Sequence, residues 1–250
     1  DYGHAIYPTA DCGFVTVGTT YSFGAGNYDA LIVKTDNFGT MEWATAYGDV
    51  KEDILTGVIP MPNDDGYFAW GVNTAYNPDG WADNLILRTN ANGDMLWKRV
   101  FGQDISDYFG EIIPLPNGHF LGAGIYSVYS LFTTELDENG NTLWMQTYDM
   151  QNNEYVRRLL ALPDGSYLVC GGFQTTGNTY DIYLLNVDSQ GKVNWSRGYG
   201  NTENEHLNDI IPATNGGFIL AGSTDSDGAG KTDGLLIKIN ETNGDVVWAK

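Results

Sequence analysis

The chain of 250 residues carries 32 aspartates and glutamates against 12 lysines and arginines, which gives a formal net charge of −20. This charge repels the phosphates of nucleic acid and excludes general nucleic-acid binding. No apolar run approaches the roughly 18–20 residues of a membrane span, so membrane insertion is also excluded. The 7 tryptophans, 16 tyrosines and 10 phenylalanines exclude a disordered chain. The partners that remain are cations, polar small molecules, glycans and basic protein surfaces.

The composition also indicates a location. Lysine is scarce, whereas Asn, Asp, Gly and Thr are abundant, and together with the acidity this favours an extracellular or cell-surface protein. We expect the chain to be part of a larger surface protein. Cys12 and Cys170 lie far apart and match no metal or redox spacing, so two free thiols are predicted.

Two short patterns each occur five times in chain order. An aromatic residue precedes a glycine by four positions in Phe14–Gly18, Tyr67–Gly71, Phe120–Gly124, Tyr167–Gly171 and Phe218–Gly222. A glycine precedes a tryptophan by four positions in Gly39–Trp43, Gly93–Trp97, Gly140–Trp144, Gly191–Trp195 and Gly244–Trp248. Successive tryptophans of this pattern are 54, 47, 51 and 53 residues apart. A fixed period of this length predicts a repeat architecture.

Each repeat contains four short strand-like runs separated by turn residues. In the last repeat they are His206–Ile211, Gly217–Ala221, Gly234–Ile239 and Asp245–Ala249. Asn215-Gly216 between the first two is typical of a tight hairpin, and a second short turn ends in Gly244. Four antiparallel strands per unit of about 50 residues predict an all-β, five-bladed β-propeller.

We expect one propeller domain over residues 1–250, with blades of about 1–48, 49–102, 103–149, 150–200 and 201–250. The sequence repeat stops two residues after Trp248. It therefore leaves open whether five blades close by packing alone or belong to a longer array.

The repeats resemble those of a known family. Gly216–Gly222 and Asp233–Asn240 are similar to the β-propeller repeats of secreted and surface proteins of bacteria and archaea. Thr242–Trp248 resembles the tryptophan-docking motif of quinoprotein-like propellers. The resemblance covers the whole chain and implies architecture, but it identifies no quinone site. It does not fix an activity, because such repeats serve as scaffolds, binding modules and enzymes. The tryptophans are expected to pack blade against blade.

Carboxylates recur just before the first strand of every blade. With the first strand innermost, as in most propellers, they would surround the mouth of a central funnel: Asp1, Asp53, Asp107, Glu154 and Glu205. Like charges this close favour a bound cation, and calcium is the only cofactor that we consider. The alternative is that each carboxylate accepts hydrogen bonds from the N–H groups of its own turn.

A chemically mixed band follows on the same strands and contrasts with the repetitive remainder. We predict a ligand site from His4, Thr56, Tyr108, Glu111, Tyr155, Arg157, Arg158, His206, Asn208 and Asp209. The alternative for this band is a polar plug in which arginine–carboxylate pairs close the funnel.

The predicted function is that of a non-catalytic binding or display module. Its ligand, a carbohydrate or a protein, would contact the acidic face that carries the long loops between second and third strands. Aromatic residues of these loops would stack on a flat ligand: Tyr21, Phe23, Tyr28, Tyr76, Trp81, Tyr126, Tyr129, Phe173 and Tyr180. Two alternatives remain, namely a glycoside hydrolase with Glu111 and Asp209 as its central carboxylates, and a purely structural surface repeat.

Overall fold

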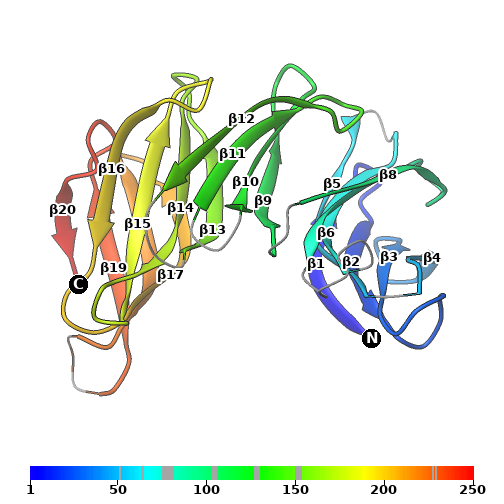
Figure 1. The fold of residues 1–250 in the computed structure, drawn as a ribbon, viewed down its shortest axis with the longest axis horizontal. Coiled ribbons are helices and arrows are strands. Elements are labelled where there is room, and N and C mark those ends of the chain that lie inside the picture. Colours follow the sequence, from blue (N-terminus) through cyan, green and yellow to red (C-terminus); the bar gives the residue numbers. More distant parts are fainter. Residues whose placement is uncertain are drawn as a thin grey trace. The chain divides into compact units, whose positions relative to one another are not determined.

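The computed structural model describes residues 1–50, 52–62, 65–74, 82–102, 106–126, 130–149, 154–226, 228 and 230–250. Within these ranges all regular structure longer than a single turn is β-strand (Figure 1). None of the described segments forms a helix with the length and apolarity that crossing a membrane requires. The chain divides into two units, Asp1–Phe109 and Gly110–Lys250, which are described separately below.

The strands form five antiparallel sheets of four, and in each sheet neighbouring strands are consecutive in sequence. The first two sheets contain β1 (Tyr2–Pro8), β2 (Phe14–Thr20), β3 (Asp29–Thr35), β4 (Met41–Tyr47), β5 (Asp53–Pro60), β6 (Tyr67–Asn73), β7 (Asp83–Thr89) and β8 (Met95–Phe101). The third contains β9 (Tyr108–Pro114), β10 (Phe120–Tyr126), β11 (Ser130–Leu136) and β12 (Thr142–Asp149). The last two contain β13 (Glu154–Ala161), β14 (Tyr167–Gln174), β15 (Tyr180–Val187), β16 (Val193–Tyr199), β17 (Glu205–Pro212), β18 (Phe218–Thr224), β19 (Asp233–Ile239) and β20 (Val246–Ala249).

Five four-stranded meanders are the blades of a five-bladed β-propeller, so the predicted fold class is confirmed. The observed strand bounds agree with those predicted from the sequence, because the residues of the turns fix them locally. At the turn between β7 and β8, Gly93 has a φ of 82° and its N–H donates to the carbonyl of Asn90 over 3.1 Å. The side-chain oxygen of Asn90 accepts the N–H of Asp94 over 2.9 Å. Whether residues 1–250 act as one domain stays a prediction.

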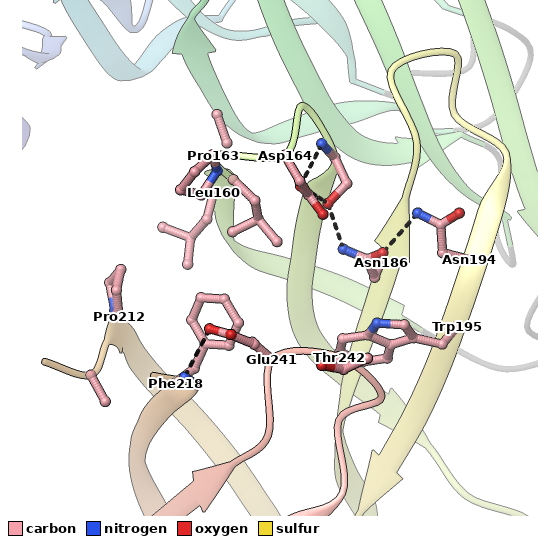
Figure 2. A pocket seen from close by; sticks show the side chains of 15 residues that line it. Leu160, Pro163, Asp164, Asn186, Asn194, Trp195, Pro212, Phe218, Glu241 and Thr242 are labelled. Atoms are coloured by element: carbon pink, nitrogen blue, oxygen red, sulfur yellow. Dashed lines mark hydrogen bonds between the residues drawn. The ribbon is translucent and has the colours of Figure 1, made fainter. Parts of the chain in front are cut away.

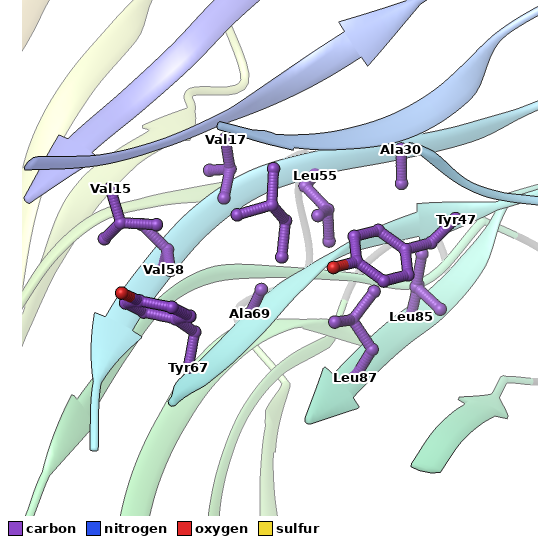
Figure 3. Packing of buried hydrophobic residues seen from close by; sticks show 11 residues of the cluster. Val15, Val17, Ala30, Tyr47, Leu55, Val58, Tyr67, Ala69, Leu85 and Leu87 are labelled. Atoms are coloured by element: carbon purple, nitrogen blue, oxygen red, sulfur yellow. The ribbon is translucent and has the colours of Figure 1, made fainter. Parts of the chain in front are cut away.

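Apolar side chains of neighbouring blades form the core. In the first unit, Val15, Val17 and Ile32 of the first blade pack with Leu55, Leu85 and other side chains of the second (Figure 3). A corresponding cluster in the second unit joins Leu168 and Leu184 to Leu207 and Leu220. The fourth strand of each blade is mostly exposed, and so is β1 of the first blade, so burial is concentrated on the other strands. The hydrophobic effect therefore holds successive blades together face to face.

A second contact between blades repeats at the end of the fourth strand. Trp195 lies so close to Gly244 of the next blade that a Cβ there would be 2.7 Å from the indole ring. Four residues further on, the hydroxyl of Tyr199 donates to the carbonyl of Gly244 over 2.6 Å. Trp43 with Tyr47, and Trp144 with Tyr148, make the same contacts to Gly93 and Gly191. The structure thus places these three tryptophans between blades, as expected.

We predict that Tyr199→Phe lowers the free energy of unfolding by about 1 kcal/mol, because it removes one buried hydrogen bond and leaves a carbonyl unpaired. Urea unfolding measures this change, and Tyr21→Phe, which removes a hydroxyl from a side chain that is 58% exposed, is the control. Equal stability of the two variants would contradict the role of the tyrosine contact.

Candidate ligand-binding site

A pocket of the second unit lies between its last two blades, at the end where the tight turns are. It has a volume of about 680 Å³. Figure 2 shows Trp195 at its wall, beside Thr242 of the next blade, with Leu160 and Pro163 on the other side. The full lining is Leu160, Ala161, Leu162, Pro163, Asp164, Ser166, Asn186, Asn194, Trp195, Pro212, Ala213, Gly217, Phe218, Glu241 and Thr242.

Hydrogen bonds fix the polar groups of this pocket. The side-chain amide of Asn186 donates to Ser166 Oγ over 3.2 Å, and its Oδ1 accepts the amide of Asn194 over 2.9 Å (Figure 2). Across the pocket, Glu241 accepts the N–H of Gly217 over 3.1 Å. Amide groups held in this way can donate hydrogen bonds to a polar ligand or accept them from it, and the carboxylate can accept them. The half-buried indole of Trp195 offers a flat apolar surface.

A pocket at the corresponding place lies between the two blades of the first unit. Its volume is about 370 Å³, and Trp43 takes the position of Trp195. The residues at the two amide positions are charged here, since Lys34 replaces Asn186 and Glu42 replaces Asn194. Lys34 Nζ donates to Asp11 over 2.6 Å and to Glu42 over 2.8 Å. The repeat therefore builds the same cavity twice with different polar walls.

These pockets were not predicted from the sequence, although a signal was present. The third strand of every blade carries a polar or charged residue nine or ten positions before the tryptophan: Lys34, Arg88, Glu135, Asn186 and Lys238. In the structure all of these side chains except Glu135 are buried. Three of them donate hydrogen bonds to a residue in the turn between the first two strands of the same blade: Lys34 to Asp11, Arg88 to Asp65 and Lys238 to Asn215. A buried polar residue at a fixed place indicates either a bonded wall or a binding site.

The predicted mixed band lies at the opposite end of the strands. In four blades a β-bulge interrupts the pairing of the first two strands, between Gly3 and Ala5, Leu55 and Gly57, Val156 and Arg158, and Leu207 and Asp209. The bulged residues are His4, Thr56, Arg157 and Asn208, and all four are exposed. A bulge changes the direction of side chains. The side chains of this band therefore do not follow simple alternation along the strand.

Three of the predicted residues meet in the second unit. Arg158 Nε donates to Asp209 over 2.7 Å and its Nη1 donates to Glu111 over 3.0 Å. The other oxygen of Glu111 accepts the N–H of Leu159. Burial raises the pKa of Glu111, whereas the hydrogen bond from Arg158 lowers the pKa of Asp209. The two carboxylates therefore share one arginine, but their pKa values are shifted in opposite directions.

Aromatic residues lie beside this network. The hydroxyl of Tyr155 is 3.3 Å from Nδ1 of His206. The ring of Tyr180 lies 6.2 Å from that of Tyr155 and 5.8 Å from that of His206, between ring centres. Arg157 donates to the carbonyl of Asn208 over 3.4 Å. First strands of successive blades are thus adjacent here.

The other predicted ligand residues, His4, Thr56 and Tyr108, belong to the first unit. His4 Nε2 lies 3.2 Å from Thr19 Oγ1, and the Thr56 hydroxyl donates to the carbonyl of Trp70 over 3.5 Å. Tyr108 is half-buried at the start of β9. Their part in a common site stays a prediction.

The five predicted metal-binding carboxylates occupy equivalent positions, and four are buried: Asp53, Asp107, Glu154 and Glu205. Asp1 accepts the hydroxyl of Thr20, and Glu205 accepts that of Thr224. In the described ranges no three His, Cys, Asp or Glu side chains converge as metal ligands. A shared central cation site stays untested. Of the predicted stacking aromatics, Tyr76, Trp81 and Tyr129 lie outside the described residues.

Comparisons with known proteins support the fold. No family profile and no curated protein sequence matches the chain. Among solved structures, an enzyme assigned provisionally as an exo-β-1,3-galactanase from Bifidobacterium bifidum aligns with a TM-score of 0.52 and 14% identity, over 97% of this chain and 89% of its own. A β-1,3-galactosidase of glycoside hydrolase family 43 aligns with a TM-score of 0.56 and 11% identity, over 98% and 58%. Puromycin hydrolase aligns with a TM-score of 0.61 and 13% identity, over 99% and 39%.

At identities of 11% to 14% these likenesses concern the fold, and the three proteins differ in what their names say they act on. The resemblance to propeller repeats therefore holds at the level of architecture, without a particular repeat family. The chain has the β-propeller fold.

Proposed function

We propose that the protein binds carbohydrate in the pockets between its blades, as a non-catalytic module outside the cytoplasm and within a larger surface protein. The observation that carries this proposal is the repeated pocket. Trp43 and Trp195 occupy the same place in two pockets, each with amide, carboxylate or ammonium groups beside the indole. The C–H face of a sugar packs on an indole, while fixed polar groups bind its hydroxyls. Several equivalent shallow sites suit a module that binds repetitive glycans by multivalency.

The names of two aligned structures support a first choice of sugar. Two of the aligned proteins carry β-1,3-galactan or β-1,3-galactoside in their names. β-linked galacto-oligosaccharides are therefore the first ligand class to examine.

Isothermal titration with β-1,3-galacto-oligosaccharides tests the proposal. We expect at least two sites per chain, one in each unit. Asn194→Leu keeps a branched side chain with the same number of non-hydrogen atoms but removes the amide hydrogen bonds, so it is expected to weaken the second-unit site about tenfold or more, the loss of one or two hydrogen bonds. Asn92→Leu, the same change at an asparagine that lines the first-unit pocket, is the control and leaves the second-unit site unchanged. An unchanged titration with both variants would contradict binding in the pockets.

A second candidate function is glycoside hydrolysis at Glu111 and Asp209. It is favoured by the opposite pKa shifts of the two carboxylates, which are typical of an acid and a base, and by the glycosidases among the aligned structures. Arg158 occupies the position between them, which favours a structural role instead. An assay for the release of nitrophenol from nitrophenyl β-galactosides distinguishes a catalytic role of the two carboxylates from a structural one. Hydrolysis that Glu111→Gln and Asp209→Asn each abolish would support the enzyme.

A further inference from the structure

A second repeated feature lies at the opposite end of the blades from the pockets, where one blade passes to the next. A glycine follows the fourth strand, at Gly48, Gly102 and Gly200. An aspartate at or next to the start of the third strand packs against each glycine: Asp29, Asp83 and Asp181. An acidic residue then begins or immediately precedes the first strand of the next blade: Asp53, Asp107 and Glu205.

The junction in the first unit between Asp83 and Asp107 is the most buried. Asp83 is 7% exposed and Asp107 is fully buried. A Cβ on Gly102 would lie 2.1 Å from Asp83 Oδ1 and 2.9 Å from Asp107 Oδ2, so the two carboxylates approach the same point. Asp83 Oδ1 is buried and accepts no hydrogen bond from the described residues. An anionic oxygen in this position is costly without a cation or a proton.

The second unit repeats this arrangement between Asp181 and Glu205. Asp181 Oδ1 is likewise buried without a partner among the described residues, and it would lie 2.1 Å from a Cβ on Gly200. Glu205 accepts the hydroxyl of Thr224 over 2.6 Å and the N–H of Asn201 over 2.8 Å. A cavity of about 310 Å³ is lined by Gly200, Glu205 and Thr224, so solvent ions have access to this junction.

The remaining junction contains its own positive charge. Lys98 Nζ donates to Asp53 over 2.9 Å and lies 3.8 Å from Asp49. Lys98 belongs to the same blade as Asp53, and the corresponding residues in the blades of Asp107 and Glu205 are uncharged, namely Met145 after Trp144 and Ala249 after Trp248. The chain thus supplies an ammonium group at one of these three junctions.

We propose that the other two junctions, Asp83 with Asp107 and Asp181 with Glu205, each bind a divalent cation of the calcium class between blades. These junctions offer oxygen ligands, which are the ligands that Ca²⁺ prefers. Ca²⁺ binds carboxylates, carbonyls and water in flexible geometry. Two carboxylates per site agree with the absence of any three-residue acidic or histidine cluster in the described ranges. A low ligand charge gives an affinity of about 10⁻⁴–10⁻³ M, as in extracellular modules.

The proposal differs from the central ring of carboxylates predicted from the sequence. Each site combines one acid at the start of a blade with an aspartate of the preceding blade. In support, burial and the neighbouring acid raise the pKa of both Asp83 and Asp181. A cation at either site would join two blades and so stabilise the folded chain.

Thermal unfolding in EDTA and in 10 mM CaCl₂, together with calcium titration calorimetry, tests the proposal. We expect two Ca²⁺ per chain and a Tm that rises by several degrees with calcium. In Asp83→Asn/Asp181→Asn the calcium response is lost, while the Tm in EDTA equals or exceeds that of the wild type because the repulsion is removed. Asp29→Asn, at the junction with Lys98, is the matched control and retains the full response.

Three results would overturn the proposal: no heat and no Tm change with calcium, an unchanged response in the double variant, or an equal loss in Asp29→Asn. A wild-type Tm that rises between pH 7 and pH 5 without any calcium response would indicate that the carboxylates share a proton instead. The proposed sugar pockets lie at the other end of the blades, so sugar binding is titrated separately in EDTA, and its result does not depend on the calcium experiments.

Discussion

Replacing Trp195 with alanine is expected to lower the free energy of unfolding by about 2–3 kcal/mol and to abolish sugar binding in the second-unit pocket. A fully buried tryptophan costs about 3–5 kcal/mol on truncation to alanine. Trp195 is half-buried, so part of its surface already faces solvent. Its ring nevertheless packs on Gly244 of the next blade and forms the pocket wall, so one change removes both functions.

Urea unfolding and sugar titration of the same variant separate these two effects. Trp195→Phe keeps an aromatic wall and is expected to retain measurable binding with a smaller loss of stability. Phe38→Ala removes an aromatic side chain that is 87% exposed, and its free energy of unfolding should change by less than about 0.5 kcal/mol. If Trp195→Ala bound sugar as well as the wild type does, Trp195 would be a packing residue only.

The second large effect is expected at Arg158. Arg158→Met should lower the free energy of unfolding by about 2 kcal/mol, because it leaves the largely buried carboxylate of Glu111 without its cation. The figure lies below the range for fully buried pairs because Arg158 and Asp209 are 42% and 48% exposed. Arg157→Met changes an adjacent, exposed arginine whose one hydrogen bond described above is to a carbonyl, and should have little effect.

The same variant carries a pH dependence with a definite sign. Because Arg158 lowers the pKa of Asp209, the pair stabilises the protein above the ordinary carboxyl range and loses this contribution as the pH falls. Without Arg158 that loss disappears, and protonation of Glu111 below its raised pKa relieves its burial. The deficit of Arg158→Met relative to the wild type should therefore shrink from pH 7 to pH 4 in urea titrations. A deficit that grows on acidification would contradict the network, and Glu111→Gln/Arg158→Met should recover most of the lost stability.

The fold followed from the sequence because its determinants are local. Asn90 and Gly93 define a turn within four residues, and the same pattern repeats in every blade, so strand bounds were correct to within a few residues. The packing of neighbouring blades also followed, since a repeated unit must bury its faces against its neighbours. The packing of the tryptophans between blades needed only the repeat period and the blade order, whereas the tyrosine contacts to the next glycine were not predicted.

The candidate site was less accessible to such reasoning. The pocket at Trp195 combines a hairpin turn and three strands of one blade with residues of the next, and the first-unit pocket differs from it in volume and in the charge of its polar wall. In the mixed band, bulges at Arg157 and Asn208 change the side-chain directions, and alternation gives no sign of them. The sequence predicted that an arginine of this band would pair with carboxylates. It did not predict that Arg158 bridges Glu111 and Asp209.

A crystal structure of the protein soaked with a β-1,3-galacto-oligosaccharide tests the central claim most directly. The account predicts a sugar ring on the indole of Trp195, with Asn194 within hydrogen-bond distance, and a second on Trp43. A sugar bound instead between Glu111 and Asp209, or its absence from both tryptophan pockets at saturating concentration, would contradict it.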